Sequence, residues 1–308
     1  MFFYALMAAL LGVVLGNILR IPGLRLAIPF LLFIMLFPSF LDIELSDIPA
    51  IILKPGLLII ALLINFVLCP LIIFALVRVF PISHHPLLVA GVLLFGLIPC
   101  GGMGPAYTRF LNGNIHLAVT ITALSLFITI GVVPLWINLL IGRSTQVPML
   151  LIMKYLAVMI FIPFCLAEIT RRFLIKKRGF EAFDRIKKKA QSLAGPALLL
   201  MMFIVSLLNG ERICSEPLIV LEILLPSLSF LIILLIFSSF ISHLLRWRHA
   251  DSAAFIVSTT TKNNAISITV ALSTFGTEAA LANAITGPLV QAPLMLLYIS
   301  LIMSRIKT

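Results

Sequence analysis

Two stretches of this chain place helix-breaking or polar residues inside runs that are otherwise apolar. The first, Pro99–Pro105, contains two prolines and three glycines, and the second, Ser258–Asn264, reads Ser-Thr-Thr-Thr-Lys-Asn-Asn. Hydrocarbon cannot hydrogen-bond a freed peptide group, so irregular backbone survives at membrane depth only where protein or a water-filled cavity surrounds it. Interrupted segments at matching places in two halves of a chain indicate a transporter's substrate site. We therefore predict a secondary transporter.

The composition excludes a soluble globular protein. Of the 308 residues, 62% are hydrophobic and 11% are charged, and the mean hydropathy is +1.22, whereas soluble domains carry about 25% charged residues. Apolar runs close to the roughly 20 residues that a membrane helix needs predict an all-α protein within the lipid bilayer. Hydropathy places ten spans at residues 2–19, 26–41, 55–79, 86–109, 115–141, 148–173, 192–209, 217–245, 251–275 and 278–303.

Basic residues concentrate in one connection between the predicted spans. They are Arg171, Arg172, Lys176, Lys177, Arg178, Arg185, Lys187, Lys188 and Lys189. Such clusters are typical of cytoplasmic loops, which predicts a multi-pass protein of the cell membrane with both termini in the cytoplasm. Apart from Phe180 and Phe183, the cluster lacks aromatic residues that would stack on bases, so we expect no nucleic-acid partner.

The ten spans divide into two sets of five near residue 145, which gives units 1–145 and 146–308. An odd number of spans in each half inverts the second half relative to the first, as in inverted-repeat transporters. The Pro/Gly interruption falls in the fourth span and the Thr/Lys/Asn interruption in the ninth. The predicted fold is an all-α membrane protein of ten transmembrane helices in two inverted five-helix repeats. Discontinuous helices four and nine belong to a core that rocks against a panel of other helices.

The first interruption contains the candidate binding residues Cys100, Gly101, Gly102 and Met103. Proline lacks an amide donor and glycine permits unwinding, and an unwound turn exposes carbonyl groups to cations and amide groups to anions. A plain kink that allows close helix packing is the alternative. Cys100 offers a soft sulfur ligand, which would bind a metal only if the solute is a metalloid. Otherwise it is a buried apolar filler.

Lys262 is the most informative residue of the second interruption, because it lies deep in an apolar span. An ammonium at that depth costs about 3 kcal/mol or more and marks a functional site by default, although a lysine can also snorkel to the interface. The neighbouring Asn263 and Asn264 supply both donors and acceptors. Further polar residues that would line a wet path are Ser258 and Thr261 in the same span, Thr122 and Ser125 in the fifth, and Gln291 in the tenth.

Two groups of motifs resemble known transporters. Gly101-Gly102 through Gly113-Asn114, followed by residues 115–119, is similar to the GG…GN-x-x-L-(A/S)-V stretch of bile acid:sodium symporters. Pro99-Cys100 with Met103 resembles the Pro-Cys-x-x-Met of arsenite-efflux permeases, in which that cysteine is functionally important. Similarity to the same permeases continues through residues 263–264, 270–272, 275–276, 279–281 and 287–290. The chain thus resembles the bile/arsenite/riboflavin transporter superfamily, which implies ten spans with broken fourth and ninth helices.

The chain departs from both groups at positions that carry charge. The permeases usually have acids where this chain has Ile266 and Gln291. Sodium-coupled symporters have Glu and Gln sodium ligands where the alignment places Ser258 and Lys262. An ammonium repels sodium, whereas a buried lysine can couple transport by releasing its proton. We therefore expect coupling to H⁺ rather than to Na⁺, and no cofactor.

Together these features predict an ion- or proton-coupled secondary active transporter that moves a small organic anion by alternating access. An arsenite or metalloid efflux permease is one alternative. A passive channel is another, although isolated interruptions suit an occluded site better than a pore. No enzyme is expected, because H-E-x-x-H and G-x-S-x-G motifs and close acid pairs within the spans are absent. The pattern specifies neither the solute, nor the direction of transport, nor the oligomeric state.

Overall fold

The computed structural model describes residues 2–19, 21–41, 55–80, 82, 85–142 and 149–306, and every element within them is helical. The predicted boundary between the two halves, at residues 145–146, lies outside the described residues. In chain order the elements are α1 (Phe2–Ile18), the 3-10 helix η1 (Pro22–Ala27), α2 (Ile28–Leu41), α4 (Pro55–Leu63), the π-helix η3 (Ile64–Leu68), α5 (Cys69–Val79), α6 (Pro86–Leu97), α7 (Met103–Phe110), α8 (Ile115–Ile141), α9 (Met149–Leu208), α10 (Gly210–Ser215), α11 (Leu218–Leu244), α12 (His249–Thr260), α13 (Asn264–Phe275), α14 (Thr277–Thr286), the π-helix η5 (Gly287–Gln291) and α15 (Ala292–Ile306).

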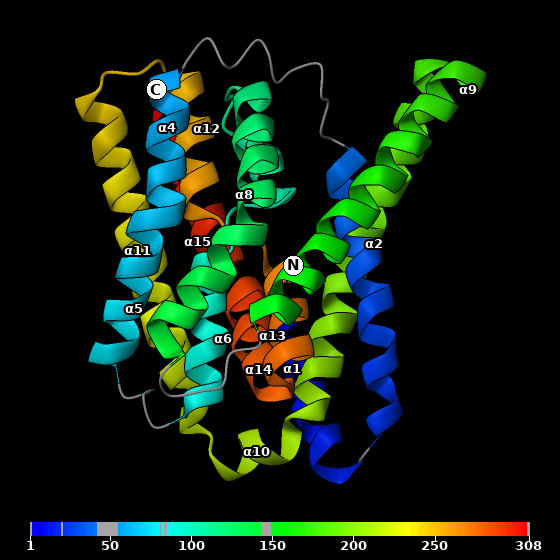
Figure 1. The fold of residues 1–308 in the computed structure, drawn as a ribbon, viewed down its shortest axis with the longest axis vertical. Helices are drawn as coiled ribbons and strands as arrows, with labels where there is room; N and C mark the ends of the chain where they lie inside the picture. The colour runs from blue at the N-terminus through cyan, green and yellow to red at the C-terminus, as the bar shows by residue number, and fades with distance from the viewer. Residues whose placement is uncertain are drawn as a thin grey trace.

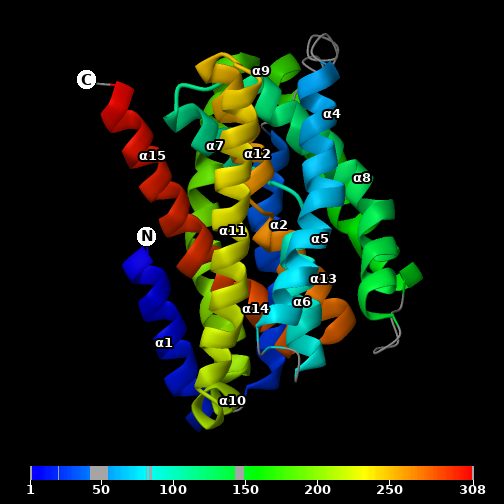
Figure 2. The ribbon, with the colours of Figure 1, turned by 90° about the vertical axis from the view of Figure 1, so that its left-hand side faces the viewer.

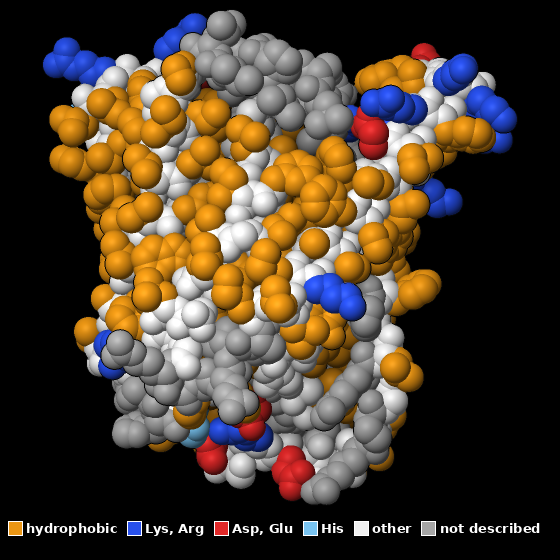
Figure 3. Space-filling view, viewed as in Figure 1, with side chains coloured by type: hydrophobic (Ala, Val, Ile, Leu, Met, Phe, Trp, Pro, Cys, Tyr) orange, Lys and Arg blue, Asp and Glu red, His pale blue; other side chains and the backbone are white. Residues whose placement is uncertain are grey.

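Long apolar helices make up most of this bundle. Among the described residues, five helices are long and apolar enough to cross a membrane, and two shorter apolar helices, Leu6–Ile18 and Pro86–Leu97, accompany them. The five are Pro55–Val79, Ile115–Ile141, Met149–Leu208, Leu218–Leu244 and Thr277–Ser304. Hydrophobic side chains cover most of the described surface between the two ends of the molecule in the view of Figure 3. These features agree with an all-helical, multi-pass membrane protein.

α9 is a helical hairpin. In Figure 1 it rises to one corner of the molecule and returns towards α10 at the opposite end. The chain reverses at Gly179, whose φ of 79° and ψ of 173° are not helical, and such a positive φ favours glycine. The connection predicted between the spans 148–173 and 192–209 is therefore helical on both sides of Gly179. Its Lys, Arg, Glu and Ala residues are good helix formers, which extends the helices beyond their apolar parts.

Both predicted interruptions are present. α6 ends at Leu97 and α7 begins at Met103, whereas α12 ends at Thr260 and α13 begins at Asn264. α6, α12 and α13 are buried over most of their lengths and lie among the other helices in Figures 1 and 2. Irregular backbone at these places is thus enclosed by protein, as the hydrocarbon environment requires.

One end of the bundle, which we term the basic end, carries Arg109, Lys187, Lys188, Arg246 and Arg248. These residues lie at the end of α7, in α9 near its reversal, and in the turn before α12. The C-terminus points towards this end, whereas the described N-terminus lies about midway along the long axis in Figures 1 and 2. α10 lies at the opposite end.

Candidate functional site

The two interruptions lie against each other inside the bundle. The Asn263 amide donates a hydrogen bond to the Pro99 carbonyl at 3.0 Å, and Cys100 Sγ lies 2.8 Å from Thr261 Oγ1. A side chain at Gly101 would collide with the side-chain amide of Asn263, so this close approach requires glycine. Segments 161 residues apart in the chain thus form a single site.

A side chain from η5 supplies hydrogen-bond partners for the backbone of the second interruption. The Lys262 amide donates to Gln291 Oε1 at 2.7 Å, and Gln291 Nε2 donates to the Lys262 carbonyl at 3.0 Å. Lys262 and Gln291 are 3% and 4% exposed. Each of these buried peptide groups would cost about 1–3 kcal/mol if it lacked a partner. The amide of Gln291 therefore holds the unwound turn in place.

The ammonium of Lys262 is surrounded by neutral groups. Lys262 Nζ donates to Asn65 Oδ1 at 3.3 Å and contacts Cys69 Sγ at 3.1 Å, and it lies 5.5 Å from the centre of the Phe230 ring. Among the described residues Lys262 forms no ion pair. A cation over an aromatic face is stabilised by about 0.5–2 kcal/mol, which is small beside the cost of burying an uncompensated charge.

Asn65 and Cys69 contact Lys262 Nζ, and the sequence analysis did not include either of them in the site. Their spacing of four residues places both on one face of a helix, and Pro70 follows directly. Pro70 has no amide donor, and the nearby Phe66 carbonyl accepts a hydrogen bond from Trp136 Nε1 at 2.8 Å. This spacing beside a proline was the signal available in the sequence.

Two of the residues that form hydrogen bonds with Lys262 belong to π-helical segments. Asn65 belongs to η3 and Gln291 to η5, and short π-helical segments within α-helices occur frequently at functional sites. Asn65 Nδ2 also donates to the Ser258 carbonyl at 3.3 Å, which joins η3 to α12. The interrupted helix is therefore held from two sides by segments whose own helical geometry is altered.

A cavity of about 330 Å³ adjoins the two interruptions. Seven predicted site residues line it, namely Gly101, Gly102, Met103, Lys262, Asn263, Asn264 and Gln291. Asn263 caps α13 by accepting a hydrogen bond from the Ile266 amide at 3.2 Å. The buried Asn264 Oδ1 has no hydrogen-bond partner among the described residues, so it offers an acceptor at the start of α13.

The other predicted residues are buried and do not line this cavity. Cys100, Thr122, Ser125, Ser258 and Thr261 are each at most 2% exposed and do not line the cavity. The hydroxyl groups of Ser125 and Ser258 have no hydrogen-bond partner among the described residues. No group of three or more His, Cys, Asp or Glu side chains that would hold a metal ion occurs in the described part of the chain.

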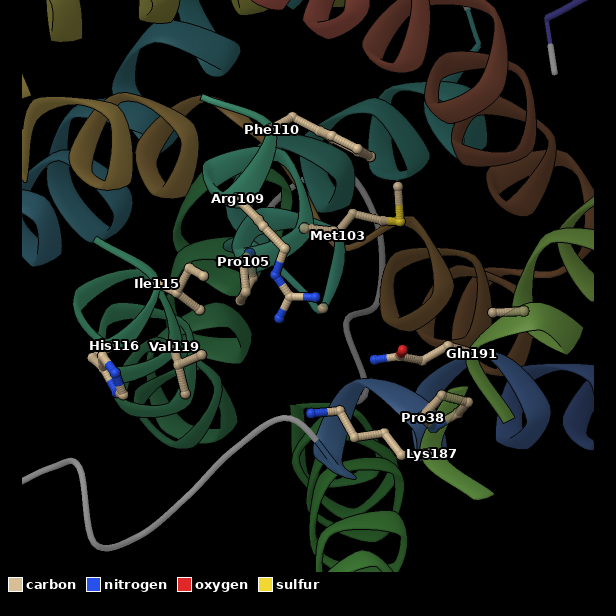
Figure 4. Close-up of a pocket in the computed structure, with 13 residues that line it drawn as sticks. Pro38, Met103, Pro105, Arg109, Phe110, Ile115, His116, Val119, Lys187 and Gln191 are labelled. Atoms are coloured by element: carbon tan, nitrogen blue, oxygen red, sulfur yellow. The ribbon is translucent and has the colours of Figure 1, made fainter. Parts of the chain in front are cut away.

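A larger cavity of about 530 Å³ lies at the basic end, and Figure 4 shows side chains directed into it. Its polar lining residues include Arg109 of α7, His116 of α8, and Lys187 and Gln191 of α9. Gly102, Met103, Gln191 and Ala194 line both cavities, so the larger cavity leads to the two interruptions. The sequence analysis did not include Arg109, Lys187 or Gln191 in the site.

Comparison with known proteins identifies relatives along most of the chain. The model of the Sodium Bile acid symporter family matches residues 29–216. The arsenical-resistance protein Acr3 of Corynebacterium glutamicum is 24% identical over 90% of this chain and 78% of its own length. An uncharacterised transporter of Synechocystis is 22% identical over 94% of this chain and 84% of its own length. The human hepatic sodium/bile acid cotransporter is 29% identical over 37% of this chain and 32% of its own length.

Proposed function

Because the chain belongs to the sodium bile acid symporter family of transporters, we propose that it is a secondary active transporter that carries a small organic anion across the cell membrane together with protons. The observation that carries this proposal is a buried lysine, Lys262, at the wall of a cavity and without an ion pair among the described residues. An anionic solute would compensate that charge.

The proposed architecture is ten transmembrane helices in two inverted five-helix repeats, residues 1–145 and 146–308, that alternate access to the cavity. An odd number of spans per half supports the inversion. The basic end would face the cytoplasm, because lysine and arginine are enriched on that side of membrane proteins. The C-terminus, which points towards the basic end, would then be cytoplasmic, and we propose the same side for the N-terminus.

The surroundings of the smaller cavity support an anion as solute. α7 begins at Met103 and α13 at Asn264, and both residues line the cavity. The start of a helix carries a partial positive charge and free amide groups that favour negative ligands. The described residues that line this cavity include no Asp or Glu. Positive potential from Lys262 is therefore not offset by a carboxylate in the lining.

Coupling to protons follows from the same lysine. A bound anion stabilises the ammonium form of Lys262, and the ammonium form strengthens binding of the anion. Such mutual stabilisation is a coupling free energy that is equal in both directions. An ammonium would also repel a sodium ion placed beside it, so H⁺ is the proposed coupling ion. When the anion leaves, loss of the proton removes an uncompensated buried charge.

Accumulation of radiolabelled carboxylates in proteoliposomes with an imposed pH gradient and no sodium tests this proposal. The native protein should concentrate its solute against a gradient, which a passive channel cannot do. Lys262→Ala should abolish accumulation, whereas Lys189→Ala, which removes an exposed lysine outside both cavity linings, should retain it. Full proton-driven accumulation by Lys262→Ala would refute the role given to Lys262.

Efflux of arsenite is the second candidate, supported by two arsenical-resistance relatives and by Cys100 at the first interruption. Cys100 is 1% exposed and its Sγ contacts Thr261 Oγ1, so a metalloid would have to displace that contact. A strain that depends on this protein should lose arsenite tolerance when Cys100 is replaced by Ser. Unchanged tolerance in the Cys100→Ser strain would leave the organic anion as the solute.

A further inference from the structure

The larger cavity at the basic end, which we term the vestibule, presents positive side chains on facing walls. Arg109 extends from α7 and Lys187 from α9, and in Figure 4 both point into the same space. His116 and Gln191 add further polar groups to the lining. Lysines are enriched on the cytoplasmic side of membrane proteins, and a lysine present only for that reason would point to lipid headgroups or solvent. Lys187 instead points into a cavity.

The described lining of the vestibule carries two cations, Arg109 and Lys187, and no Asp or Glu. Asp184 lies one turn before Lys187 and Lys188. A hydrogen bond from Lys188 lowers the pKa of the Asp184 carboxyl, and the charges of Lys187 and Arg109 lower it further. Asp184 itself pairs with Lys188 at 2.7 Å, and it is not among the lining residues.

Most of the other side chains that line the vestibule are apolar. Phe110, Ile115 and Val119 line the vestibule together with Pro38 and Ala106. Apolar walls exclude water and strengthen electrostatic interactions of a ligand with charges at the ends of the space. A ligand that matches this lining has a short hydrocarbon body and a negative group for each cation.

The vestibule also adjoins the interruptions. Four residues of its lining, Gly102, Met103, Gln191 and Ala194, line the smaller cavity too. An anion that leaves the vestibule along this surface reaches Asn264 and Lys262. Positive groups therefore lie at both ends of this surface, where they attract a negative solute.

We propose that Arg109 and Lys187 form a docking site for a small aliphatic dicarboxylate, one carboxylate at each cation and the hydrocarbon chain against the apolar walls. This inference deepens the proposed function and rests on it for the view that the vestibule lies on the transport path. Docking itself is an equilibrium property of the vestibule. It can therefore be measured without transport and in the absence of a pH gradient.

Binding to the purified full-length protein in detergent tests the docking site. Succinate, glutarate and adipate serve as dicarboxylate probes, butyrate as the monoanion and succinamide as the neutral analogue, with affinity measured by calorimetry. At least one dicarboxylate should bind more tightly than butyrate, and succinamide should not bind. Arg109→Gln and Lys187→Gln should each weaken dicarboxylate binding about tenfold or more, since a hydrogen bond to a charged group contributes about 1.5–3 kcal/mol.

Lys189→Gln is the matched control, because it removes the same charge from an exposed position of the same helix. It should leave the affinity unchanged, and Arg109→Lys should retain most of it. Equal weakening by Lys189→Gln, or no preference for any dicarboxylate over butyrate, would overturn the docking site. Lys262→Ala separates the two proposals: it should lose transport but keep binding that is sensitive to Arg109. If Lys262→Ala loses transport while Arg109→Gln and Lys187→Gln bind normally, only the docking site is wrong.

Discussion

The two interruptions, residues 98–102 and 261–263, differ in what unwinds them. The first contains Pro99, Gly101 and Gly102, which disfavour a continuous helix in any surroundings. The second is Thr-Lys-Asn, whose residues have ordinary helix propensities. Its shape depends on partners from elsewhere, namely the Gln291 side chain and the Pro99 carbonyl. The first interruption is therefore intrinsic, whereas the second is conditional and exists only while other helices bond its peptide groups.

Among the variants that test this difference, Gln291→Leu should lower the stability of the protein the most. It leaves the Lys262 amide and carbonyl buried without their partners, at a cost of about 2–6 kcal/mol for two groups. Thermal unfolding in detergent should show a lower midpoint, and accumulation in proteoliposomes should be lost.

Gln291→Glu provides the graded control. A carboxylate keeps the acceptor for the Lys262 amide but loses the donor for the Lys262 carbonyl, so its midpoint should lie between those of the native protein and Gln291→Leu. If Gln291→Leu unfolds at the native temperature, the second interruption does not depend on this clamp, and the contrast between the two interruptions fails.

The sequence predicts where the interruptions occur but not which residues hold them in place, and the reason is physical. Proline and glycine act on their own backbone, so the first interruption could be located from local residues alone. Lys262 stood out because a cation within an apolar run is costly wherever it occurs. Partners of Lys262 lie far away in the chain, as Asn65 is 197 residues distant. Only the packing of helices brings such residues together.

The π-helical segments and the α9 hairpin likewise could not be predicted from local sequence. Periodicity that places Asn65 and Gln291 on α-helices does not reveal that η3 and η5 adopt wider turns, because tertiary contacts decide this. Hydropathy located the apolar parts of α9 but not its charged helical extension. A charged helix has no apolar run by which hydropathy could detect it.

Gly101→Ala should cause the second-largest loss of stability. It tests how closely the two interruptions must approach each other. The added methyl group meets the side chain of Asn263, which is itself held by its bond to the Ile266 amide. Overpacking of this kind costs about 1–3 kcal/mol, measured as a lower unfolding midpoint. Gly131→Ala in α8 is the matched control, since nothing lies within 4 Å of its added methyl group. It should be neutral or stabilising, because alanine is the better helix former.

Thr261→Val should have a smaller effect and measures the side-chain contact between the interruptions. The change keeps the shape of the side chain but removes the hydroxyl that contacts Cys100 Sγ and donates to the Val257 carbonyl. Thr269→Val removes a similar buried hydroxyl that donates to the Ala265 carbonyl but has no cysteine partner. The Thr261 variant should be less stable than the Thr269 variant by about 1 kcal/mol.

A double-mutant cycle with Cys100→Ala isolates the contact between Thr261 and Cys100. The losses from Thr261→Val and Cys100→Ala should not add, because either change removes the same contact. Strict additivity would mean that the contact between Thr261 and Cys100 contributes nothing to stability.

Pro99→Ala should have the smallest effect, although it changes the residue that most obviously breaks the helix. Alanine retains the carbonyl that accepts the hydrogen bond from Asn263, and Gly101, Gly102 and Pro105 still disfavour a continuous helix. The free energy of unfolding should change by less than about 1 kcal/mol, mainly through the greater freedom of the unfolded chain. Comparing the thermal unfolding midpoints of Pro99→Ala and Gln291→Leu measures the difference between the two interruptions directly. A loss for Pro99→Ala as large as that for Gln291→Leu would mean that the first interruption also depends on a single residue, and that the distinction between an intrinsic and a conditional interruption does not hold.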